Sequence, residues 1–165
     1  METAFSPSCA RQYLKKMDVG YLTDGQLRTL LHAIRCLNDI DAIRFTLLAI
    51  ERTRLPPMEL FWSQNDTQKG ICLRACLIIY TVTRGRVVPR QFQLEASLET
   101  YQGRDSIIIA GTGHGKTLCI VIPLLLNPKK NAILVSPLKR LQLMQVIYFT
   151  SFGICTLPIN EDTPH

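Results

Sequence analysis

The chain has 165 residues, of which 47% are hydrophobic and 19% are charged. This apolar share can form a folded core and excludes a disordered chain, and the composition also excludes collagen-like and disulfide-scaffold proteins. The formal net charge is +6. Residues 1–84 hold 11 basic and 8 acidic side chains and residues 85–165 hold 8 and 5, so each part is at +3. Because no basic run stands out, the charge alone does not identify an anionic partner.

The N-terminus has no apolar stretch of signal-peptide length, and the longest apolar run, residues 118–126, is too short to span a membrane. We therefore expect neither export nor membrane insertion. The six cysteines are dispersed and form no CxxC pair. Cys72 and Cys76 would share one face of a helix, which predicts two buried thiols in a reducing compartment, with a zinc site as the alternative.

Residues 1–84 are predicted to be helical. Thr23 and Gln26 have the spacing of a capping box at a helix start. Apolar residues then recur at helical spacing in two stripes, 27–37 and 40–50, which predict a helical hairpin that stops at Pro56 and Pro57. Residues 71–83 are apolar nearly throughout, and their length favours a helix over a strand.

Residues 85–165 show a different pattern, in which short β-branched runs alternate with longer apolar stretches. Strands are expected at 106–109, 132–135 and 154–159, with a helix after each of the first two. This order is typical of an α/β fold with a parallel sheet. The sequence thus predicts a helical region, 1–84, followed by a partial P-loop domain, 85–165.

A glycine-rich segment between the first expected strand and its helix is the most informative motif. It runs from Ala110 to Thr117 with the sequence AGTGHGKT. Glycines let backbone N–H groups converge on an anion, and the start of a helix adds the positive end of its dipole. Lys116 would supply a charge for the β- and γ-phosphates, and the Thr117 hydroxyl would coordinate Mg²⁺. For His114, at a variable position, a solvent-facing role is favoured over a catalytic one.

Three blocks in this half resemble helicase motifs. The pattern AxTGxGKT resembles motif I of superfamily 2 helicases and is formed by Ala110, Thr112, Gly113, Gly115, Lys116 and Thr117. Upstream, residues 89–93 resemble the Q motif, or motif 0, in which the amide of Gln93 would read the adenine edge. Downstream, residues 135–146 are similar to motif Ia of RecQ-type DNA helicases. The resemblance covers residues 86–163.

The resemblance implies a RecA-like domain that binds ATP with Mg²⁺ and acts on single-stranded or partly duplex DNA in the nucleus or another DNA-containing compartment. The residues that would hold the nucleotide are Arg90, Gln93, Ala110, Gly111, Thr112, Gly113, His114, Gly115, Lys116 and Thr117, the last also binding the metal. The residues that would contact DNA are Ser136, Pro137, Lys139 and Arg140. Residues 160–163 fall where a further DNA-contacting loop would lie.

Motif Ia is also consistent with DNA contact without the resemblance. Ser136 could cap the following helix, and Pro137 fits a first helical turn. The start of such a helix, with Lys139 and Arg140 close by, favours phosphate.

The acidic pair that such helicases need for ATP hydrolysis is not found in these 165 residues. Downstream of Thr117 only Glu161 and Asp162 are acidic, in the reverse order of a DExH box. Within these residues no arginine follows Arg140, and they are too few to include a second motor lobe. We therefore expect a fragment of the first motor lobe that binds ATP but neither hydrolyses it well nor unwinds DNA alone, because positioned charges provide most of the catalysis of phosphoryl transfer.

Two alternatives remain at this stage. One is a non-catalytic nucleotide- or nucleic-acid-binding module that acts on a protein partner through its helical N-terminal half. The other is a P-loop kinase or another NTPase, against which the spacing of Gln93 and the SPLxxLxxxQ block argue.

Overall fold

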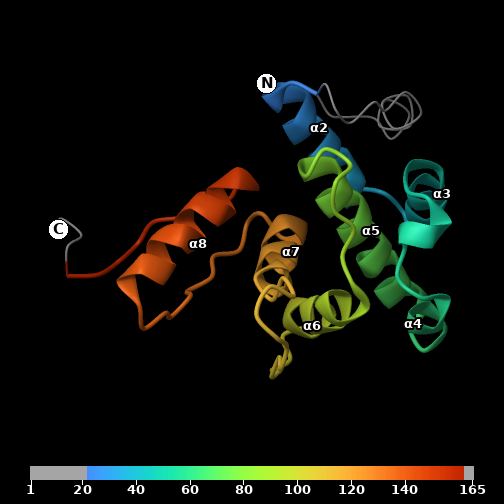
Figure 1. Cartoon of the computed structure of the whole chain (residues 1–165). Coiled ribbons are helices and arrows are strands. Elements are labelled where there is room, and N and C mark those ends of the chain that lie inside the picture. Colours follow the sequence, from blue (N-terminus) through green and yellow to red (C-terminus); the bar gives the residue numbers. More distant parts are fainter. Residues whose placement is uncertain (1–21, 162–165) are drawn as a thin grey trace.

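The computed structural model describes residues 22–161, and this part of the chain is built from helices (Figure 1). Cys9, Asp162 and Thr163 lie outside the described residues. The helices are α2 (Asp24–Arg35), α3 (Asp39–Ala49), the 3-10 helix η2 (Arg52–Arg54), α4 (Met58–Trp62), α5 (Asp66–Val82), α6 (Gln91–Tyr101), α7 (Leu118–Leu126) and α8 (Lys139–Ser151). None of these helices is both long and apolar enough to cross a membrane.

The capping box predicted at the start of α2 is confirmed. The Gln26 backbone N–H donates to Thr23 Oγ1 at 3.3 Å, and the Thr23 backbone N–H donates to Gln26 Oε1 at 2.9 Å. Asn65 and Gln68 form the same reciprocal pair at the start of α5, with distances of 2.9 and 3.1 Å. Such pairs satisfy N–H groups that a helix start leaves without a partner.

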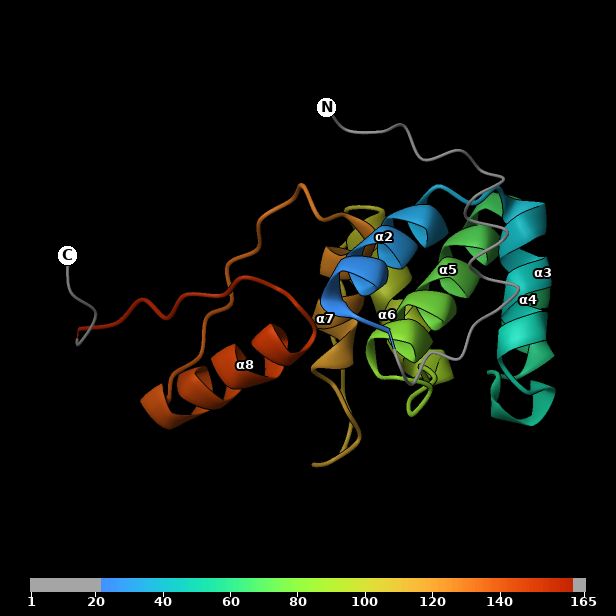
Figure 2. The same ribbon diagram turned by 90° about the horizontal axis from the view of Figure 1, so that it is seen from above.

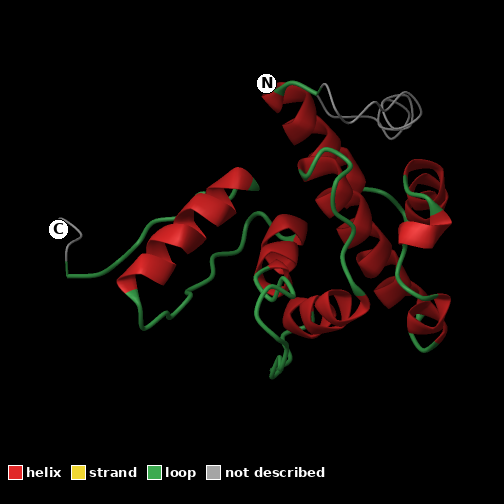
Figure 3. Ribbon diagram, in the orientation of Figure 1, coloured by secondary structure: helices red, strands yellow, loops and turns green. Residues whose placement is uncertain are grey.

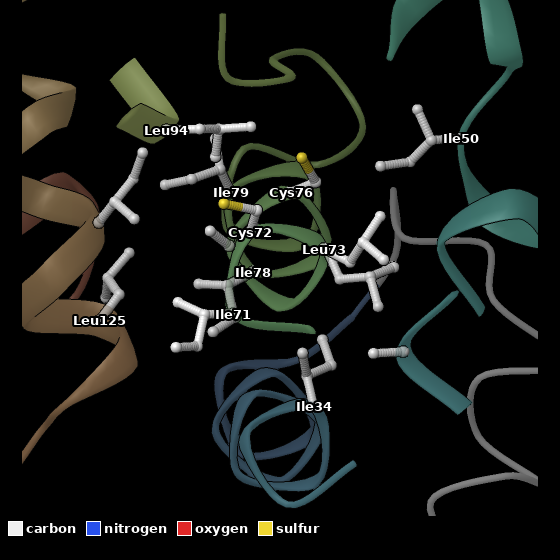
Figure 4. Packing of buried hydrophobic residues seen from close by; sticks show 14 of the residues in the cluster. Ile34, Ile50, Ile71, Cys72, Leu73, Cys76, Ile78, Ile79, Leu94 and Leu125 are labelled. Carbon is white, nitrogen blue, oxygen red and sulfur yellow. The ribbon is translucent and has the colours of Figure 1, made fainter. Parts of the chain in front are cut away.

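Helix α5 is the centre of the packing, as Figure 4 shows. The two apolar stripes of the sequence form α2 and α3, and both helices pack on α5. On its other side α5 contacts α6 and α7, which also pack against each other. The buried cluster thus includes Ile34 of α2, Ile79 of α5, Leu94 of α6 and Leu125 of α7. One apolar core therefore joins residues from both sides of position 85.

The apolar run at 71–83 is helical, as predicted, and the two thiols it carries are buried. Cys72 is 1% exposed and Cys76 is fully enclosed. Both are free cysteines within α5, and Figure 4 shows their side chains among the buried apolar residues. The prediction of buried thiols is confirmed.

The predicted parallel sheet is wrong, because residues 22–161 contain no strand (Figure 3). The segments expected as strands lie in irregular chain, with side chains turned to solvent: Ile107 is 92% exposed and Ile133 is 95% exposed. A β-branched run favours an extended backbone, whereas a parallel sheet also needs hydrogen-bonded neighbours and cover on both faces. Here helices complete the apolar core without these segments, so the RecA-like sheet is not part of the described structure.

Helix α8 lies to one side of the other helices in both views (Figure 1 and Figure 2). An extended connection, residues 127–138, leads to it from α7. The last turns of α8 reach the core through Phe149, which is 4% exposed. Much of the rest of α8 is exposed, including its apolar residues Leu143 and Ile147.

Candidate nucleotide and nucleic-acid site

The glycine-rich loop lies between the irregular segment after α6 and the start of α7. Gly113 and Gly115 have φ angles of +80° and +78°, a backbone region that side chains with a Cβ atom rarely adopt. Thr117 is the N-cap of α7 and already has helical backbone angles. The loop therefore turns directly into the helix, although no strand precedes it.

Several backbone N–H groups of this loop are available to a ligand. Those of Gly113, Gly115, Lys116 and Thr117 make no backbone hydrogen bond among the described residues. They lie at the N-terminal end of α7, where the helix dipole is positive. N–H groups at a helix start that make no backbone hydrogen bond are the kind of donor that a phosphate group accepts from.

The Lys116 side chain folds back over its own loop. Its Nζ donates to the backbone oxygen of Ala110 at 2.7 Å and to that of Gly111 at 2.9 Å. A phosphate oxygen would be a stronger, charge-assisted acceptor than either carbonyl. Thr117 is half-buried beside it, and its hydroxyl is the loop group that could hold Mg²⁺.

Gln93 is brought to the loop, as its expected part in the same site requires. The side chain is buried, with 3% exposed. Its Nε2 donates to the backbone oxygen of Gly115 at 2.9 Å and to that of His114 at 3.3 Å, while its Oε1 accepts from the Arg90 N–H at 2.8 Å. Both ends of the amide are thus engaged within the protein, and reading of adenine by this residue stays a prediction. The Arg90 side chain is exposed.

His114 is exposed, and its ring covers the neighbouring backbone. Its Nδ1 lies 3.3 Å from the backbone oxygen of Thr112. A Cβ atom at Gly111 would come within 2.9 Å of the ring. A side chain at position 111 would therefore require the exposed His114 ring to move.

The expected helix cap at Ser136 is wrong. Helix α8 begins at Lys139, its N-cap is Leu138, and no side chain caps it. Ser136 Oγ is buried without a hydrogen-bond partner among the described residues, while its backbone oxygen accepts from Gln142 Nε2 at 2.9 Å. The reason is that the helix starts two residues later than the Ser-Pro pair indicates.

The other residues expected to contact DNA are at the surface. Lys139 forms an ion pair with Glu161, and Pro137 and Arg140 are exposed. No hydrogen bond or ion pair shown for the described residues joins this group to the glycine-rich loop. Among the expected site residues, the structure therefore gathers Gln93 with the loop and leaves 136–140 as a separate group.

Sequence reasoning also missed a set of arginines outside the expected site. Arg52 and Arg54 lie in η2, and Arg86 lies in the turn after α5. Arg54 Nη2 donates to the backbone oxygens of Gly85 and Arg86 at 2.9 and 3.0 Å, so these segments meet. No signal in the sequence indicates this, because about thirty residues separate them.

Comparison with known proteins agrees with the motifs. Residues 90–161 match the model of the DEAD/DEAH box helicase family. Neither the search of curated proteins nor that of solved structures found a match. The matched segment begins at Arg90, includes the whole glycine-rich loop and ends after α8. Residues 90–161 are therefore similar to the DEAD/DEAH box helicase family.

Proposed function

We propose that this chain binds ATP and DNA as part of the first motor lobe of a RecQ-like helicase. The observation that carries the proposal is the set of unbonded loop N–H groups at the start of α7, beside Lys116. The family match supports an ATP-dependent helicase role in general. The finer RecQ assignment is supported by the motif Ia resemblance of residues 135–146, and it implies a DNA-containing compartment such as the nucleus.

ATP binding would rearrange two contacts of the loop. The Lys116 ammonium would leave the carbonyls of Ala110 and Gly111 and bond the β- and γ-phosphates, where its charge is better matched. Mg²⁺ would neutralise the phosphates with Thr117 as one ligand. Gln93 would have to release the Arg90 N–H or the loop carbonyls to pair with adenine.

DNA would contact the surface of α8 around Lys139 and Arg140. Both side chains lie in the first turn of the helix, where the dipole also favours phosphate. Arg140 is exposed, whereas Lys139 would have to exchange Glu161 for a phosphate. Such contacts position a backbone without reading its sequence.

Binding without efficient hydrolysis is the activity we propose for these 165 residues. They contain no Asp-Glu pair in the DExH order downstream of Thr117. The transition state of phosphoryl transfer depends on positioned charges, and Lys116 with one metal would supply only part of them.

A second candidate is a non-catalytic module that also binds a protein. It is favoured by large exposed apolar side chains in the helical region, where Ile40 is 79% exposed and Trp62 is 71% exposed. Exposed apolar groups of this size are typical of interaction surfaces.

The proposal is tested by titrating wild type, Lys116→Ala and Lys130→Ala with ATP and Mg²⁺. Loss of a charged hydrogen-bond donor should weaken affinity by about tenfold or more. Lys130 is exposed in the turn after α7, so its replacement controls for the charge. Equal affinity for all three proteins would contradict the nucleotide site, and rapid ATP turnover by wild type would contradict the binding-only activity.

A further inference from the structure

Two arginine-bearing segments meet at one corner of the helical region. Arg54 of η2 donates through Nη2 to the backbone oxygens of Gly85 and Arg86, at 2.9 and 3.0 Å. These partners are 31 and 32 positions away in the sequence. The fold thus brings together arginines that are far apart in the sequence.

The turn that carries Arg86 is held in place by its own hydrogen bonds. Thr83 Oγ1 accepts from the Val87 N–H at 3.0 Å, and the Gly85 N–H donates to the Tyr80 oxygen at 2.7 Å with φ of +77° at the glycine. Arg86 Nε donates to the Thr83 oxygen at 3.0 Å. A turn fixed in this way presents its side chain with less entropy to lose on binding.

The Arg54 side chain is also fixed. Its guanidinium lies 5.4 Å from the centre of the Tyr80 ring, within the range of a cation–π contact. Its two carbonyl bonds use only Nη2, one of three nitrogens that carry N–H donors. Arg54 therefore joins the two segments and still has N–H groups that could donate to a ligand.

The corner is strongly positive for its size. Residues 51–54 and 83–90 contain five arginines and one acidic residue, Glu51. Arg52, Arg54 and Arg86 are exposed. In the described part of the chain the Arg52 side chain makes no hydrogen bond or ion pair, and Arg86 uses only Nε.

We propose that this arginine corner, formed by Arg52, Arg54 and Arg86, binds the phosphate backbone of a nucleic acid. The planar guanidinium fork matches two phosphate oxygens at once, which explains why arginines rather than lysines would serve here. All three residues lie outside the segment 90–161, so the corner adds a contact surface to the one expected at α8. The inference extends the proposed DNA binding but depends on different residues.

The test measures binding of a fluorescent single-stranded oligodeoxythymidine by anisotropy at several salt concentrations. Wild type is compared with Arg52→Ala/Arg86→Ala and with Lys129→Ala/Lys130→Ala, which removes two charges from an exposed turn. Loss of two phosphate contacts should lower the slope of log affinity against log salt by about 1.4, at about 0.7 for each contact with a single strand. The lysine pair should leave the slope near that of wild type.

Other results would overturn the inference. Equal slopes for the two double variants would show that only total charge matters. Failure of wild type to bind the oligonucleotide, or binding of polyglutamate instead through the same arginines, would show that the corner does not serve nucleic acid.

Two further measurements distinguish loss of phosphate contacts from unfolding of the variant and from failure of the nucleotide site. Arg52→Ala alone, which removes no side-chain contact, should give about half the change in slope even if the double variant unfolds. The arginine variants should titrate with ATP as wild type does, because the corner is not part of the loop. If Lys116→Ala binds ATP as well as wild type, the proposed nucleotide site fails while the corner is still tested by the slopes.

Discussion

At the scale of single residues, Gly115 couples the backbone of the phosphate loop to Gln93. Its φ is +78°, and an added Cβ would come within 2.7 Å of Gln93 Nε2. Gly103 has a similar φ of +75°, but an added Cβ there would meet no atom within 4 Å. Alanine substitutions at the two glycines therefore distinguish the cost of backbone strain from the cost of losing the Gln93 contact.

We expect Gly115→Ala to lower the free energy of unfolding more than Gly103→Ala does. Both alanines would be strained by about 1–2 kcal/mol in the left-handed region. Gly115→Ala should lose about 1 kcal/mol more, because the Cβ would displace the Gln93 amide from its carbonyl partner. Urea unfolding of the two variants measures the difference, and equal losses would show that the Gln93 contact does not stabilise the loop.

The sequence predicted which residues form this site better than it predicted their hydrogen bonds. The resemblance to the Q motif assigned Gln93 to the same site as the loop, and the structure places its side chain within hydrogen-bond distance of the loop. The bonds of Gln93 and Lys116 to loop carbonyls could not be predicted, because they depend on the path of the backbone through Gly113 and Gly115. Ser136 shows the same limit: a Ser-Pro pair permits a cap, but the register of α8 decides whether one forms.

At the scale of one helix, α5 holds two thiols whose ionisation is opposed by burial. Burial raises the pKa of Cys72 from 9.0 to about 11, and complete burial raises the pKa of Cys76 further. The folded protein keeps these protons at a pH where the unfolded chain loses them. The two thiols therefore contribute stability that is fully present below pH 9 and is lost as the pH rises.

We expect the free energy of unfolding to fall between pH 9 and 11 by up to about 1.4 kcal/mol per pH unit for each thiol. Cys76→Ala should reduce this slope, whatever its effect on stability at neutral pH. Cys155→Ala is the matched control at an exposed thiol and should leave the slope unchanged. Denaturant unfolding at several pH values between 9 and 11 measures this slope. The same slope in wild type and Cys76→Ala would show that burial of Cys76 does not cause the loss of stability.

Helices were predicted from the sequence more reliably than strands were. The capping box and apolar spacing of α2 and the length of the run in α5 are local properties, and a helix makes its hydrogen bonds locally. A strand depends on neighbours elsewhere in the chain. The runs 106–109 and 132–135 therefore predicted strands that the described structure does not contain.

At the scale of the whole molecule, amide hydrogen exchange distinguishes the helical structure from the predicted sheet. Backbone groups of 106–109 and 132–135 form no ladder in the described part of the chain, whereas α5 is buried at the centre. We expect the two segments to exchange with little protection and α5 to exchange slowest, since slow exchange requires opening of the core. Strong protection at 106–109 and 132–135 without ligand would contradict the helical structure.

The shared core has a further consequence for the chain as a whole. Arg35 of α2 donates to the Leu125 oxygen at 2.6 Å, so the first described helix is tied to the end of the helix that follows the loop. If the polypeptide were cleaved between α5 and α6 and the two pieces separated, this hydrogen bond would be lost and the apolar sides of α6 and α7 would be exposed. The piece that carries the glycine-rich loop would then expose apolar surface that α5 covers in the whole chain, which favours its aggregation.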